Sequence, residues 1–194
     1  MEPVTGLVSI NSATQLISIA DDACIRVWNT NDGSKDKSIY LPDSAELKAL
    51  TLSPNKKTFA VGDESGLVRI YETSTLNELL QIRVPSRVAA TLYSQDCKTL
   101  FVSIHRKVIK RYDLSTGESQ KDLKFGHGIQ AMSSSAAGDL FAFSNSKGNV
   151  TLWSPKMTES CTRPVCRRLV IKVQSSLRHC WSKKRFRPST TSIA

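Results

Sequence analysis

Four aromatic residues, each ending a short apolar segment, recur along this chain at a nearly constant spacing. They are Trp28, Tyr71, Tyr112 and Trp153. Successive members of this set stand 43, 41 and 41 residues apart. An aliphatic residue precedes each by three positions, at Ile25, Val68, Ile109 and Val150. A period of this length constrains the fold strongly, because each repeat must form one structural unit that packs against its neighbours.

Each unit has two further apolar runs upstream of the aromatic residue. The nearer runs are LISIA, TFAVG, LFVSI and LFAFS, and the farther runs are LVSI, LKALTL, VAATLY and IQAM. The turn-like clusters NSATQ, SPNKK, SQDCK and SAAGD separate them, and weaker runs (KSIYL, LLQIRV and KDLKF) follow the aromatic in the first three units. Short β-branched runs bounded by Gly, Asn, Asp and Ser predict antiparallel hairpins and an all-β chain. The expected strands lie near 4–10, 15–20, 24–29, 47–52, 58–62, 67–72, 88–93, 99–104, 108–113, 129–134, 140–144 and 150–153.

The repeat resembles that of the WD-repeat family over about residues 3–153. The spacing fits, the first unit ends in I-x-V-W at Trp28, and the dipeptide Gly126-His127 precedes the last unit. Pairs of a polar and a small residue stand before the third strand, at Asp22-Ala23, Ser65-Gly66 and Lys147-Gly148. No unit ends in a literal Trp-Asp, so the resemblance depends on four units in register. It implies β-propeller blades, each a twisted four-stranded antiparallel sheet packed face to face with the next.

The resemblance also assigns roles to the repeated residues. The aromatic is expected to fill the gap between neighbouring blades. We therefore expect Trp28, Tyr71 and Tyr112 to be largely buried between blades, and Trp153 to be more exposed because nothing certain follows its unit. The family's aspartate, in the turn before the third strand, typically bonds the Gly-His histidine. Only Asp22 keeps that aspartate, since Ser65, Arg106 and Lys147 stand at its place in the other units, and Lys147 is the expected partner of His127.

The repeat and the charge divide the chain into two parts. Residues 1–153 hold the blades, in units of about 3–41, 42–83, 84–124 and 125–153, with 17 basic and 16 acidic residues. Residues 154–194 have a different composition, with 10 basic residues and one acidic residue. We expect this tail to be largely irregular, with RRLVIKV as a candidate fourth strand for the last blade.

Four blades are fewer than the seven with which WD propellers usually close. We expect an incomplete ring, as in a fragment, a truncated isoform or a divergent gene product, and a closed four-bladed ring is the alternative. In an open ring the outer faces of the first and fourth blades expose apolar side chains, which favours association with another chain or with a second copy.

The sequence favours no catalytic or cofactor chemistry. It lacks a Gly-x-Ser-x-Gly elbow, a phosphate loop and a His-Glu-x-x-His pair. Asp21-Asp22 is interpreted as part of a turn, and His105, His127 and His179 fall in different units. A zinc site from Cys161, Cys166, His179 and Cys180 is disfavoured by irregular spacing and adjacent arginines. We expect no enzyme activity, no cofactor and no bound metal.

The N-terminus has no secretory signal pattern, and no apolar run approaches the ~18 residues that span a membrane. Five cysteines, an odd number, favour a reducing compartment, and we expect a cytoplasmic or nuclear protein that is not secreted.

The leading functional hypothesis is a protein-interaction scaffold within a larger complex. By analogy with the family, its partner contacts lie on the loops of one rim, with Arg87, Arg106, Lys107 and Lys147 as candidates. The alternative is a nuclear or nucleolar ribonucleoprotein component whose basic tail contacts RNA. Its cluster, Lys183, Lys184, Arg185 and Arg187, fits both a nuclear-import signal and a phosphate contact, while a solvated tail with neither role remains open.

Overall fold

The computed structural model describes residues 2–11, 14–104, 108–124, 128–145, 148–154 and 170–172. These residues form four separate four-stranded sheets, each an antiparallel meander in chain order. No helix in the described ranges is long and apolar enough to cross a membrane.

The first sheet contains β1 (Val4–Ile10), β2 (Gln15–Ala20), β3 (Cys24–Asn29) and β4 (Lys35–Tyr40). The second contains β5 (Leu47–Leu52), β6 (Thr58–Asp63), β7 (Leu67–Glu72) and β8 (Glu78–Arg83). The third contains β9 (Val88–Tyr93), β10 (Thr99–Ile104), β11 (Val108–Asp113) and β12 (Ser119–Lys124). The fourth contains β13 (Ile129–Ser134), β14 (Phe141–Asn145), β15 (Asn149–Trp153) and β16 (Val170–Lys172).

The strand prediction is confirmed. All twelve expected strands are present with ends that agree within one residue, and the weaker runs after the aromatics form β4, β8 and β12. The segment RRLVIKV supplies β16, which pairs with β15 and completes the fourth sheet. The first three predicted units therefore each correspond to one sheet, and the fourth sheet extends past the predicted end of its unit at residue 153 to include β16.

The same turn chemistry recurs between the first and second strands of the last three sheets. A serine hydroxyl accepts the backbone N–H of the residue that opens or precedes the second strand: Thr58 donates to Ser53, Thr99 to Ser94 and Leu140 to Ser135. Before the third strand a small residue adopts positive φ, at Ala23 (57°), Gly66 (90°) and Gly148 (73°). At Gly66 a Cβ would lie 2.5 Å from the Val84 carbonyl oxygen, which explains why glycine occupies this turn.

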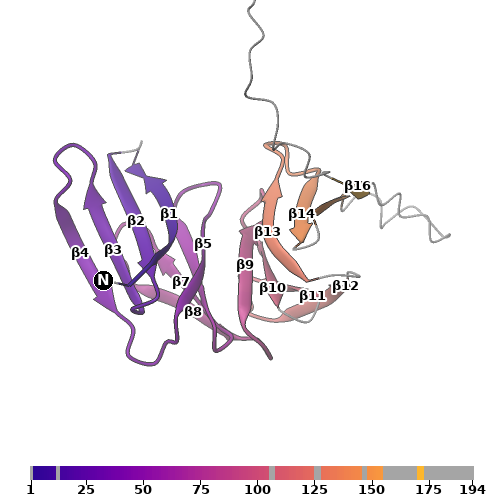
Figure 1. Cartoon of the computed structure of the whole chain (residues 1–194), viewed down its shortest axis with the longest axis horizontal. Coiled ribbons are helices and arrows are strands. Elements are labelled where there is room, and N and C mark those ends of the chain that lie inside the picture. Colours follow the sequence, from indigo (N-terminus) through magenta and orange to yellow (C-terminus); the bar gives the residue numbers. More distant parts are fainter. Residues whose placement is uncertain are drawn as a thin grey trace, which may run out of the picture.

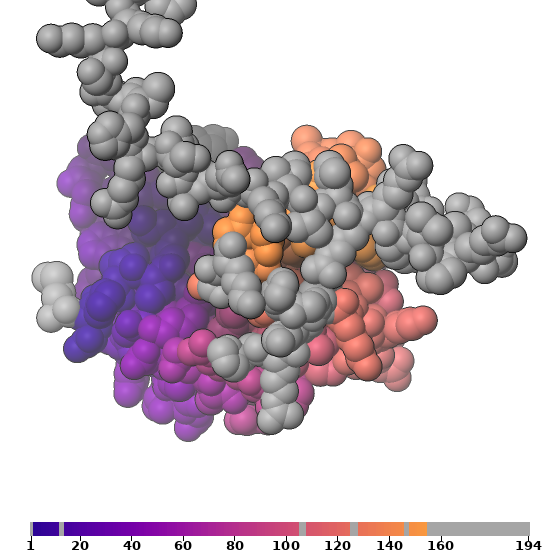
Figure 2. Space-filling model, turned by 45° about the vertical axis from the view of Figure 1, so that its right-hand side comes forward, coloured from indigo at the N-terminus to yellow at the C-terminus, as the bar shows by residue number. Residues whose placement is uncertain are grey.

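The sheets follow one another in chain order and do not form a closed ring within the described residues. The first strands β1, β5, β9 and β13 contact one another in succession and lie through the middle of the molecule (Figure 1). The first and fourth sheets lie at opposite ends of this row. In the space-filling view the colours likewise pass in sequence from indigo on the left, through magenta below, to salmon and orange on the right (Figure 2).

Apolar side chains fill the seams between successive sheets. We call the face of each sheet toward the preceding sheet its rear face, and the opposite face its forward face. Phe59 and Tyr71 on the rear face of the second sheet pack with Ile17 and Ile25 on the forward face of the first. The next seam joins Leu100 and Tyr112 to Val68 and Ile70, and the third joins Phe141 and Trp153 to Phe101 and Ile109.

In the last three sheets the repeated aromatic therefore faces the preceding sheet, and in all four it lies opposite a large apolar residue on the second strand. These cross-strand pairs are Leu16–Trp28, Phe59–Tyr71, Leu100–Tyr112 and Phe141–Trp153. Tyr71 and Tyr112 are buried, at 3% and 6% exposure, as predicted. Trp28 is half-buried, and its predicted position between two blades is wrong for the described residues, because no described sheet covers the rear face of the first sheet.

Trp153 is also half-buried, and thus more exposed than the two tyrosines, but the expected reason was wrong. Its ring packs backward, on Phe141 at a centroid distance of 5.4 Å and on Phe101 at 6.3 Å. Contacts with the third sheet therefore help to close this seam.

Replacing Tyr71 by alanine tests whether this ring stabilises the packing between the first and second sheets. The ring stacks on Phe59 at 5.3 Å and is almost fully buried, so Tyr71→Ala should lower the free energy of unfolding by about 3–5 kcal/mol. Urea unfolding followed by circular dichroism measures the change. Tyr40→Ala, at a residue 64% exposed, is the matched control and should change it by less than about 0.5 kcal/mol. Equal effects at the two positions would contradict the seam assignment.

Candidate functional site

The rear face of the first sheet carries three of the five large hydrophobic side chains that are exposed in the described residues. The five exposed side chains of this kind in the described residues are Val4, Leu7, Tyr40, Leu79 and Leu140. The strand register places the first three, at 59%, 62% and 64% exposure, on this one face. In the second, third and fourth sheets the corresponding face packs against a neighbouring sheet. The rear face of the first sheet thus corresponds to a face that is packed in the other sheets, but no described sheet covers it.

The centre of this face is the pair Leu16 and Trp28, both half-buried. The indole Nε1 of Trp28 donates to the hydroxyl of Ser18 at 2.8 Å, which fixes the ring against the sheet. The ring is therefore already oriented for contact, and an incoming surface need not reorder it.

The turn residue Asp22 closes one end of the same face. Its carboxylate accepts hydrogen bonds from the Arg26 guanidinium and from the Cys24 N–H. The hydrogen bond from Arg26 is the main reason that the pKa of this carboxyl lies below its ordinary value. The resemblance implied a histidine partner; the partner seen is Arg26.

The predicted rim residue Arg87 lies in a row of ion pairs that cross the seams. An acidic residue in the turn before the third strand of one sheet meets a basic residue where the next sheet begins. Asp21 accepts from Lys48 Nζ at 2.7 Å, and Glu64 lies 3.7 Å from Arg87. Lys48 also pairs with Glu46 at 2.7 Å, and the hydrogen bonds from Lys48 to these two carboxylates raise the pKa of its ammonium group. Arg87 is half-exposed and engaged with Glu64, so its role toward a partner stays a prediction.

The remaining predicted site residues fall outside the described residues. These are Arg106, Lys107, Gly126, His127, Lys147, Lys183, Lys184, Arg185 and Arg187. The disfavoured zinc ligands in the tail are also outside. The described part of the chain contains no group of three or more His, Cys, Asp or Glu side chains placed to hold a metal ion.

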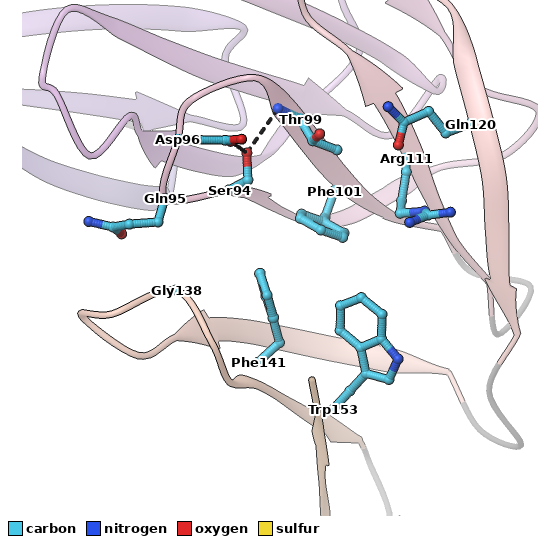
Figure 3. A pocket seen from close by; sticks show the side chains of 10 residues that line it. All are labelled: Ser94, Gln95, Asp96, Thr99, Phe101, Arg111, Gln120, Gly138, Phe141 and Trp153. Atoms are coloured by element: carbon cyan, nitrogen blue, oxygen red, sulfur yellow. Dashed lines mark hydrogen bonds between the residues drawn. The ribbon is translucent and has the colours of Figure 1, made fainter. Parts of the chain in front are cut away.

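A cavity of about 330 Å³ lies at the seam between the third and fourth sheets (Figure 3). Its apolar part is formed by Phe101, Phe141 and Trp153, and polar side chains border it at Gln95, Asp96, Arg111 and Gln120. Sequence reasoning did not single out Arg111 and Gln120. Alternation along β11 and β12 was the available signal, because it assigns both to the forward face with Phe101, where the second sheet carries aliphatic residues.

The two ion pairs across the seams should differ in strength. Lys48 holds two carboxylates at 2.7 Å, whereas the Arg87 pair is longer and more exposed. Lys48→Met should lower the free energy of unfolding by about 1 kcal/mol in low salt, and Arg87→Met by less than about 0.5 kcal/mol. Urea unfolding at 20 mM and 1 M NaCl measures both, with the Lys48 effect shrinking in high salt. A larger effect at Arg87 would contradict this ranking.

Comparison with known proteins supports the fold. No protein-family model and no curated protein sequence matches the chain. Among solved structures, the structure of U3-55K matches with a TM-score of 0.71 at 21% sequence identity. The match covers 81% of this chain and 50% of that one, so the chain spans about half the length of this WD40 propeller protein. Together with the four antiparallel sheets, this likeness shows that the chain folds as the blades of a β-propeller.

Proposed function

We propose that the chain is a non-catalytic interaction scaffold that works as a subunit of a larger protein assembly. The observation that carries this proposal is the uncovered rear face of the first sheet. It presents Val4, Leu7 and Tyr40 together with the half-buried Trp28, where the other sheets receive a neighbour. Large exposed apolar patches on soluble proteins mark interaction surfaces.

This face extends its apolar surface farther toward the outer strand than the second and third sheets do. Tyr40 on β4 stands opposite Cys24, and the residues at the same place in the second and third sheets are Arg83 and Lys124. An aromatic ring replaces a cation there, and rings of this kind are enriched at protein interfaces. A partner, either another chain or a second copy, binds this face, and the rim residues Arg87, Arg106, Lys107 and Lys147 add contacts.

The proposed compartment is the cytoplasm or the nucleus. Cys24 and Cys97, the two described cysteines, are free thiols. Burial is the main cause that raises the pKa of the Cys24 thiol, which disfavours the reactive thiolate form. Free thiols of this kind suit a reducing compartment.

A substitution pair tests the interaction surface. The full chain should associate with increasing concentration in sedimentation velocity, and Leu7→Ser with Tyr40→Ser should weaken that association at least tenfold, because the two changes remove most of the exposed apolar area. Leu79→Ser on β8, at a side chain 56% exposed on another sheet, is the matched control and should leave association unchanged.

The result that opposes the proposal is a compact monomer at every concentration. A sharp calorimetric transition, independent of concentration, would show that the rear face needs no partner.

The charge of the tail favours a second candidate function, that of a ribonucleoprotein component. Residues 154–194 carry ten basic residues and one acid, whereas residues 1–153 are nearly neutral. A segment with this charge attracts RNA phosphates without reading sequence. In this candidate the blades bind protein and Lys183, Lys184, Arg185 and Arg187 contact the RNA backbone.

Neutralising the tail cluster tests the RNA candidate. We expect weak, salt-dependent binding of a fluorescent single-stranded oligouridine, measured by anisotropy. Replacing Lys183, Lys184, Arg185 and Arg187 by glutamine should remove most of the binding and lower the slope of log K against log salt by about 3. The control replaces four exposed lysines of the sheets, Lys57, Lys98, Lys121 and Lys124, in the same way. If the control loses binding and the tail variant keeps it, the RNA site is on the blades.

A further inference from the structure

The third sheet departs from the packing pattern of the second at its forward face. On the second sheet the forward-facing residues at the end of the seam are Ala60, Ile70 and Leu80, all aliphatic. The same three places on the third sheet hold Phe101, Arg111 and Gln120. Two polar side chains thus point toward a neighbouring sheet where the preceding seam has only hydrocarbon. A local break in an otherwise repeated pattern is where function is expected.

At this place the seam between the third and fourth sheets contains a cavity whose apolar side is formed by aromatic rings. Figure 3 shows Phe101 descending from the third sheet toward Phe141 on the fourth, with Trp153 beside them. The Phe101 and Phe141 rings lie 4.9 Å apart and are buried, whereas Trp153 is half-buried and supplies an accessible apolar edge. The turn at Gly138 closes the other side, since a Cβ there would lie 2.5 Å from the Gln95 Cβ.

Arg111 is held in place at the border of this cavity. Its Nε donates to the Lys121 carbonyl oxygen at 2.8 Å, which fixes the plane of the guanidinium group. Within the described residues no carboxylate pairs with it. The amide of Gln120, its cross-strand neighbour, borders the same space. A fixed guanidinium with unused N–H groups is suited to a carboxylate, which it can bind with two parallel hydrogen bonds.

Asp96, the acidic residue that lines the cavity, forms its hydrogen bonds with other groups than Arg111. The Asp96 carboxylate accepts from the Ser94 hydroxyl at 2.6 Å and from the Lys98 N–H at 3.1 Å. The hydrogen bond from Ser94 is the main cause that lowers the pKa of Asp96, so this residue is anionic near neutral pH. Its charge at the far side of the cavity opposes a polyanion, such as an RNA backbone, that would cross the whole opening.

We propose that this cavity binds an acidic peptide segment of a partner protein, in which an Asp or Glu side chain adjoins a large apolar side chain. The carboxylate pairs with the Arg111 guanidinium and Gln120, and the apolar side chain packs on Trp153 and Phe101. The proposal rests on the proposed role of the chain as a protein-interaction subunit and specifies a second binding surface for it, at the opposite end of the row of sheets from Leu7 and Tyr40.

Peptide arrays probed with the full chain test the proposal. One array holds acetylated, amidated nine-residue peptides with a single Asp or Glu next to Leu, Phe or Trp, and the matched array holds Asn or Gln instead. The acidic peptides should bind at least tenfold more tightly. Arg111→Gln should remove this preference, and Lys121→Gln, an equal change of charge on the same sheet, should keep it.

A second variant distinguishes loss of the binding site from loss of folding. Arg111→Ile with Gln120→Leu restores the aliphatic pair of the second sheet, so it should unfold at no lower urea concentration than the full chain while losing the acidic peptides. Equal binding of the two arrays, retained preference in this variant, or tighter binding of an oligouridine that depends on Arg111 would overturn the proposal. The Leu7→Ser, Tyr40→Ser variant should bind the peptides normally. If the full chain associates through Leu7 and Tyr40 but shows no preference for the acidic peptides, only the peptide-site proposal is contradicted, and the proposed function stands.

Discussion

The structure depends on one contact repeated at each seam, the packing of a strand-ending ring and its cross-strand partner against the sheet before it. Tyr71 with Phe59, Tyr112 with Leu100, and Trp153 with Phe141 each close one seam. A single four-stranded sheet cannot bury both of its faces, so each sheet is stable only where a neighbour covers it. The direction of the contact gives the row a polarity: among the described sheets, none covers the rear face at one end or the forward face at the other.

This polarity explains why the two ends differ chemically. The rear face of the first sheet exposes large side chains, Leu7 and Tyr40 among them, because that face is built to receive a neighbour. The forward face of the fourth sheet carries Ala131, Ser133 and Ala142 beside the half-buried Val150 and Leu152, with Leu140 exposed at its edge. Among the described residues both outer faces thus carry apolar side chains, as expected, and more of the exposed large ones lie on the first sheet.

The amino-acid pattern predicts the strands well because strand, turn and ring recur in one register. Even the detached RRLVIKV segment carries enough β-branched residues to be recognised as β16. The pattern does not predict whether the aromatic rings face the preceding or the following sheet. Alternation assigns residues to the two faces of a sheet, but it does not say which neighbouring sheet covers each face. That missing information produced the wrong expectation for Trp28. It also hid Arg111, whose polar side chain looks like an ordinary solvated residue until the fourth sheet is placed beside it.

Hydroxyl-radical footprinting of the full chain, at a concentration low enough to keep it monomeric, tests the account most directly, because it reports side-chain exposure across the whole row in one experiment. The account predicts strong labelling of Leu7 and Tyr40 and protection of Tyr71 and Tyr93, which are 3% and 1% exposed. Protection of Leu7 and Tyr40 to the level of Tyr71 in the monomer would show that the rear face of the first sheet is covered, and would contradict the account.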